Sequence, residues 1–146
     1  WFGNVNYPND EYRSIALKYF KEILSMKNIN YYKLSKGIKK IDLDEYNKFE
    51  IQDLGNKNFN QLSKYLMNLD LIISSDTVIA HLAGILNLNC ILLLNFNSDW
   101  RWFYDYKKTP WYPSIKIIKQ KKLNEWSPVF SSLKNELEMY LNKKLN

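Results

Sequence analysis

The residues best suited to chemistry in this sequence are Asp76, Thr77 and His81, which follow the apolar run 69–75. That run suits a strand buried on both faces, and the residues after it change to helical spacing. This pattern predicts a strand, a tight turn and a helix capped by Asp76. A helix that opens at the carboxyl end of a buried strand favours a phosphate, because it offers free N–H groups and the positive end of a dipole. Ser75–Thr77 is therefore a predicted anion-binding turn.

The same residues also have a purely structural interpretation. In this interpretation Asp76 serves as the helix cap and nothing more, and Thr77 fills the first turn of the helix. His81 is the only histidine, and a lone histidine in a helix is more often structural than catalytic. It lies one turn into the helix on the side of Thr77, where it could hydrogen-bond ligand oxygens. Gly84 on that side predicts the close approach of another segment, since a glycine within a helix otherwise costs about 1 kcal/mol.

The stretch 97–114 is a long loop rich in aromatic residues, in which Arg101 stands between two tryptophans. One interpretation is an aromatic clasp that packs the loop onto the domain. The other is a stacking wall for a base or sugar, formed by residues such as Trp100, with Arg101 on a phosphate. Long loops in compact domains tend to be functional, and both interpretations stay open.

Other classes of function are disfavoured by what the sequence lacks. It contains no glycine-rich dinucleotide fingerprint, P-loop or nucleophile elbow, and one histidine and one cysteine exclude the usual zinc sites. We therefore predict no metal and no cofactor. The net charge of +6 comes from scattered lysines, which disfavours nucleic-acid binding. No apolar run approaches the roughly 18 residues of a transmembrane helix, and Cys90 is predicted to be an inert core thiol.

The remaining pattern alternates strands and helices. We expect strands at 29–34, 49–54, 69–75, 90–94 and 115–119, and helices at about 11–27, 59–68, 77–86 and 126–145, with a short helix or a loop at 38–48. This alternation predicts an α/β fold, a three-layer αβα Rossmann-like domain with a mostly parallel sheet that takes in residues 1–146. Residues 1–3 have the character of the end of a strand, so we expect the chain to be a fragment of a longer protein.

Taken together, these stretches resemble a known family. SSDTVIAHLAGIL at 74–86 is similar to the D-T-x-x-x-H-x-x-(A/G) segment of the heptosyltransferase-like glycosyltransferases, family nine, which have GT-B architecture. W-F-G-N, N-D and R-S within 1–14, D-W-R-W at 99–102 and P-W-Y-P-S at 110–114 resemble the glycosyltransferase-like half of bacterial proteins that carry tetratricopeptide repeats.

The resemblance implies a C-terminal, donor-binding half with a strand order resembling 3-2-1-4-5-6. Its ligand would be a nucleotide-diphosphate sugar, and its partner an N-terminal half or a helical-repeat region. The donor-binding residues would be Asn4, Arg13, Ser75, Asp76, Thr77, His81, Trp100 and Arg101. No catalytic residue is expected here, because the base normally comes from the N-terminal half, so the isolated chain should lack turnover.

The resemblance also places the protein in the cytoplasm, free or peripheral to the inner membrane. In one respect the sequence departs from the family, because 35–40 lacks the acidic residue that heptosyltransferases use on the ribose. The rival hypothesis is a non-catalytic module that binds a glycan or a protein through 97–114. A sugar-nucleotide epimerase is a third hypothesis, but its active site would require more acidic and histidine side chains near the diphosphate than this sequence offers.

Overall fold

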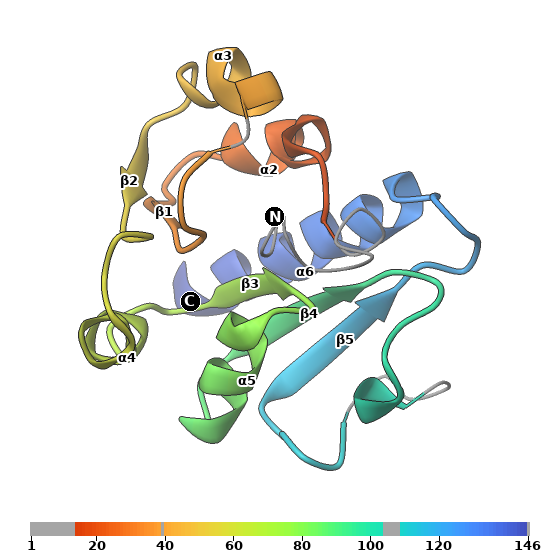
Figure 1. Cartoon of the computed structure of the whole chain (residues 1–146). Coiled ribbons are helices and arrows are strands. Elements are labelled where there is room, and N and C mark those ends of the chain that lie inside the picture. Colours follow the sequence, from red (N-terminus) through yellow and green to blue (C-terminus); the bar gives the residue numbers. More distant parts are fainter. Residues whose placement is uncertain (1–13, 39, 104–108, 146) are drawn as a thin grey trace.

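The computed structural model describes residues 14–38, 40–103 and 109–145 (Figure 1). In this part the chain is an α/β protein with two parallel sheets, one of two strands and one of three. The strands are β1 (Tyr31–Lys33), β2 (Ile51–Asp53), β3 (Ile72–Ser75), β4 (Cys90–Leu94) and β5 (Ile115–Lys119). Each predicted strand within the described residues is therefore confirmed, although most are shorter than expected.

The order of the strands fits a doubly wound sheet. β1 pairs with β2, and β3, β4 and β5 pair in that order, every pair being parallel. If a strand ending at 1–3 is counted as strand 1, β1 to β5 become strands 2 to 6, and the two observed orders are 3-2 and 4-5-6. Position 1 of the expected order then falls on residues that lie outside the described part of the chain.

Helices cover the larger sheet on both faces, which gives the three predicted layers (Figure 1). α4 (Phe59–Leu66) and α5 (Val78–Ile85) pack on one face, and α6 (Ser127–Leu145) and α2 (Lys21–Leu24) on the other. Alternate side chains of β4 enter the two cores, so all of its residues are buried, as its continuous apolar run predicted. Along α6, Val129, Leu133 and Leu137 recur at helical spacing and are buried.

The predicted helix at 11–27 is confirmed only in part within the described residues, because helical structure covers 17–24. Residues 14–16 have no regular structure, and a 3-10 turn (η1, Leu17–Phe20) leads into α2. Ile15 and Leu17 are both buried. In a helix, two residues spaced by two lie on different faces, so a helix would not bury both on one face. The extended backbone of Ala16 between them turns both side chains toward the core.

Of the two structures expected for 38–48, a short helix or a loop, the short helix is present. A 3-10 turn (η2, Lys40–Asp42) precedes α3 (Leu43–Tyr46), which lies beyond the two-stranded sheet (Figure 1). Among the described residues, no helix combines the length and the apolar character that crossing a membrane would require.

Candidate functional site

The predicted strand, turn and helix are present, but the cap is not the predicted residue. β3 ends at Ser75, and α5 starts at Val78 with Thr77 as its N-cap. Asp76 instead accepts a hydrogen bond of 2.8 Å from the indole N–H of Trp102. The cap assignment to Asp76 was wrong because a buried indole donor, supplied by a distant loop, engages its carboxylate.

The hydroxyl of Thr77 is used inside the turn. Ser74 Oγ donates to the carbonyl oxygen of Ser75 at 2.8 Å, so in its 3.1 Å contact with Thr77 Oγ1 it is Thr77 that donates. The Thr77 side chain makes no capping bond to the helix. An anion at this turn would therefore be bound by backbone N–H groups rather than by the threonine hydroxyl.

Those N–H groups are available at the start of α5. Among the described residues, the backbone N–H groups of Val78 and Ile79 have no hydrogen-bond acceptor. Val78 is 53% exposed, so solvent reaches the first turn of the helix. The first turn of an α-helix leaves such donors unsatisfied by geometry, and here no side-chain cap replaces a ligand.

His81 is held by aromatic rings rather than left open to a ligand. Its ring stacks on Trp102 with centroids 4.8 Å apart, and its Nδ1 lies 3.2 Å from the hydroxyl of Tyr112. Burial lowers the pKa of His81 below its usual value, although the charge of Asp76 opposes this shift. Through these contacts the imidazole joins α5 to the loop.

Gly84 confirms the predicted close approach. A Cβ atom at this position would lie 2.3 Å from Cγ of Tyr112, so only glycine admits the tyrosine ring here. We call Trp102 and Tyr112 the aromatic clasp. They contact Asp76 in the turn before α5, and His81 and Gly84 within α5. The structural interpretation of the loop is thus confirmed for these two residues, which sequence reasoning had not separated from their neighbours.

Other residues of the same loop face outward. Trp100 is 74% exposed and Trp111 is 60% exposed. The guanidinium of Arg101 donates to the carboxylate of Asp99 at 3.0 Å and lies 6.0 Å from the centre of the Trp100 ring. Asp99 also accepts from the backbone N–H of Arg101, which fixes a 3-10 turn (η3, Trp100–Trp102) that puts Trp100 outside and Trp102 inside.

Ser75, another predicted site residue, does not direct its side chain toward this turn. Ser75 is 1% exposed and, by the alternation of β3, faces the opposite side of the sheet from Ser74, toward α6. Its hydroxyl has no hydrogen-bond partner. Asn4 and Arg13 lie outside the described residues.

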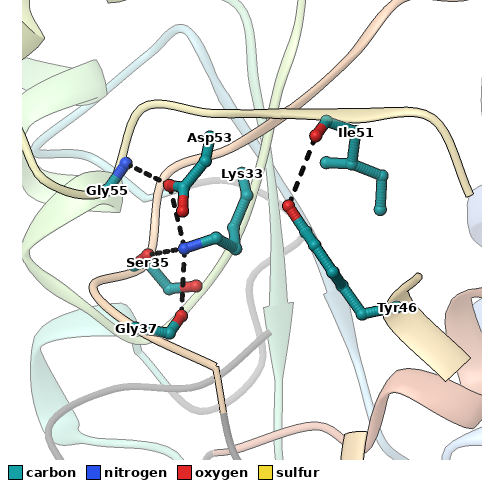
Figure 2. Close-up of polar contacts among 7 residues, drawn as sticks. All are labelled: Lys33, Ser35, Gly37, Tyr46, Ile51, Asp53 and Gly55. Atoms are coloured by element: carbon teal, nitrogen blue, oxygen red, sulfur yellow. Dashed lines mark hydrogen bonds and ion pairs between the residues drawn. The ribbon is translucent and has the colours of Figure 1, made fainter. Parts of the chain in front are cut away.

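A buried lysine occupies the carboxyl edge of the smaller sheet, as Figure 2 shows. Lys33 Nζ lies 2.9 Å from the carboxylate of Asp53 and donates to the carbonyl oxygens of Ser35 at 2.7 Å and Gly37 at 2.9 Å. Its side chain is 1% exposed. Because three oxygens use all three ammonium donors, Lys33 fastens the loop after β1 to β2 and is not a free ligand group.

Gly55 belongs to the same cluster. Its N–H donates to Asp53 at 2.8 Å, and a Cβ at this position would lie 2.0 Å from the carbonyl oxygen of Ser35. Burial raises the pKa of Asp53, but the hydrogen bonds from Lys33 and Gly55 and the lysine charge outweigh it, so the pKa lies below its usual value. Sequence reasoning missed this lysine clamp, which we define as Lys33, Ser35, Gly37, Asp53 and Gly55.

Two surface hollows lie away from the start of α5. One of about 350 Å³ is lined by residues of α4 and its flanks, and one of about 210 Å³ by residues near the start of β1. Within the described ranges, no group of three or more acidic, histidine or cysteine residues could hold a metal ion.

Comparison with known proteins adds no relative. No protein-family model matches the sequence, and neither the curated proteins nor the solved structures contain a match. The function must therefore be argued from the α/β fold and from the turn at the start of α5.

Proposed function

We propose that this chain is the donor-binding half of a metal-independent GT-B glycosyltransferase, which transfers a sugar from a nucleotide-diphosphate sugar to a glycan or other acceptor. The observation that carries the proposal is the position of the α5 N-terminus. It opens at the carboxyl end of β3, which is the edge strand of the sheet β3-β4-β5. In the expected order 3-2-1-4-5-6, this strand stands at the point where the strand order reverses. Open α/β sheets bind ligands at such reversals of strand order.

The described residues suggest how a diphosphate would be bound. The N–H groups of Val78 and Ile79 point out of the first turn of α5, and the helix dipole adds a positive potential there. The aromatic clasp fixes this turn, because Trp102 holds Asp76 next to it. In the resemblance, Asn4 and Arg13 complete the pocket, and a basic side chain with the helix dipole stabilises the leaving diphosphate without a metal.

Turnover would need the rest of the enzyme. The acceptor base belongs to an N-terminal half or to a region joined to helical repeats, so this chain alone binds the donor without transferring its sugar. Its location in the cytoplasm, free or at the inner membrane, is part of the same proposal.

Val78→Pro is the sharpest test of the diphosphate site. Proline is favoured at the first position of a helix, and Thr77 before it has the extended backbone that a proline requires, with φ −138° and ψ 171°. The substitution thus removes one N–H donor and leaves the helix intact. Val78→Ala is the matched control, since it removes the same exposed side chain and keeps the donor.

Calorimetry with UDP-, GDP- and ADP-sugars measures the outcome on the full-length protein. One hydrogen bond to a charged group contributes about 1.5–3 kcal/mol, so Val78→Pro should weaken donor binding about 10- to 100-fold while Val78→Ala leaves it unchanged. Thermal melting should stay the same in both variants. The proposal is refuted if the full-length protein binds none of these donors, or if both variants bind them equally well.

A further inference from the structure

The outer side of the loop that follows β4 presents aromatic rings to solvent. Trp100 and Trp111 are 74% and 60% exposed, and Phe103 contacts the ring of one and the backbone of the other. The Phe103 ring lies 6.2 Å from that of Trp111, and its backbone N–H donates to the carbonyl oxygen of Trp100 at 3.1 Å. We call these three residues the aromatic platform.

The platform is held in place from below. Trp102, next to Trp100 and Phe103, is fully buried in the aromatic clasp, and Tyr112, next to Trp111, packs on Gly84. The backbone N–H of Trp111 donates to the hydroxyl of the buried Thr109 at 3.2 Å. Trp100 and Trp111 are therefore exposed while their neighbours in the sequence are anchored to the domain.

Phe103 adds backbone strain to this arrangement. Its φ of 58° with ψ of 142° is a conformation that side chains other than glycine rarely adopt. Such strain costs about 1–3 kcal/mol and persists where surrounding contacts impose it, most often at functional sites. The strained backbone conformation of Phe103 is thus the one in which its ring lies near that of Trp111.

Among the described residues, the charges at the platform favour a neutral ligand. Arg101 donates two hydrogen bonds to Asp99, one from its backbone and one from its guanidinium, so the cation beside Trp100 is already compensated. A nucleic acid would need unpaired cations for its phosphates. The Asp99 and Arg101 side chains remain 28% and 47% exposed, which leaves their outer edges free for hydroxyl groups.

The size of the platform favours a small ligand over a protein. Two large aromatic side chains at these exposures offer about 300 Å² of apolar surface, far below the roughly 800 Å² that each partner contributes to a stable protein interface. A pyranose ring has an apolar face of C–H groups that matches an indole, and a rim of hydroxyls that matches a charged pair.

We propose that the aromatic platform binds a neutral oligosaccharide, which stacks on Trp100 and Trp111 and is hydrogen-bonded by Asp99 and Arg101. The inference goes beyond the sugar-nucleotide site and does not depend on it. The platform would hold a glycan whether or not the first turn of α5 holds a diphosphate.

The experiment titrates the full chain with neutral oligomers of glucose, galactose, mannose and N-acetylglucosamine, followed by tryptophan fluorescence and calorimetry. We expect at least one series to bind. Trp100→Ala and Trp111→Ala should each weaken that binding about tenfold or more, which corresponds to about 1.4 kcal/mol or more. Phe59→Ala on α4 is the control, because Phe59 is 62% exposed and lies outside the platform.

Val78→Pro separates this proposal from the previous one, since it should leave oligosaccharide binding unchanged. The platform proposal is overturned if no neutral oligosaccharide binds to the wild-type chain, or if both tryptophan variants bind like the wild type. A preference for single-stranded oligonucleotides or for a protein at the same tryptophans would also overturn it.

Discussion

Replacing Lys33 by methionine tests whether the lysine clamp stabilises the fold. Methionine has a similar length but no donors, so the carbonyl oxygens of Ser35 and Gly37 and the carboxylate of Asp53 lose the Lys33 ammonium (Figure 2). Each carbonyl left without a partner costs about 1–3 kcal/mol. Asp53 adds little, because its side chain is 41% exposed and keeps the Gly55 N–H.

We therefore expect Lys33→Met to lower the free energy of unfolding by about 3 kcal/mol, near the low end for breaking a buried ion pair. For a chain of this length the loss corresponds to a melting temperature lower by about 10 °C. Urea denaturation followed by circular dichroism measures it as a lower midpoint with an unchanged slope.

Lys36→Met is the matched control, because Lys36 is exposed in the same loop and should change stability by less than about 0.5 kcal/mol. Equal midpoints for Lys33→Met and the wild type would refute the reasoning. So would equal losses in both variants, since they would point to the loop sequence and not to the buried ammonium.

Three further predictions follow from other contacts. Gly84→Ala should destabilise the fold by about 1–3 kcal/mol in thermal melts despite the better helix propensity of alanine, and adding Tyr112→Ala should recover part of the loss. Because the pKa of Asp53 is lowered in the folded state, its ionised carboxylate stabilises the fold. This stabilisation is present above about pH 4 and is lost as the pH falls through the pKa of the folded state. Asp53→Asn should flatten this part of the acid-unfolding curve, and a curve of unchanged shape would contradict the shift. Burial raises the pKa of Cys90 to about 12, so a thiol reagent at pH 8 should label it only after unfolding, and rapid labelling of the native chain would show the thiol to be accessible.

The features that the sequence predicted well are those set by local pattern. The unbroken apolar run at β4 needs burial on both faces, and the structure buries it so. The glycine within α5 could be interpreted before its partner was known, because its cost in a helix demands a compensating contact. The tyrosine that makes this contact lies in a loop, where no periodicity could have identified it.

The features that it missed depend on contacts between distant residues. Lys33 has the pattern of an ordinary surface lysine, and its burial depends on Asp53 and on the carbonyls of the loop that turns at Gly37. Asp76 fits the preferences of a helix cap, yet the indole of Trp102 decided its partner. In each case a polar side chain had two satisfactory local roles, and the tertiary fold selected between them.

The position of α6 along the chain has a consequence for synthesis. This helix and the adjoining Trp126 supply five of the nine buried residues in the core between α6 and the sheet, including Leu133 and Leu137. While the ribosome is still adding these residues, Ile91 and Leu93 of the sheet lack the part of their cover that α6 supplies. This apolar face of the sheet therefore stays partly exposed to solvent until α6 has been synthesised, and aggregation through it is a hazard at that stage.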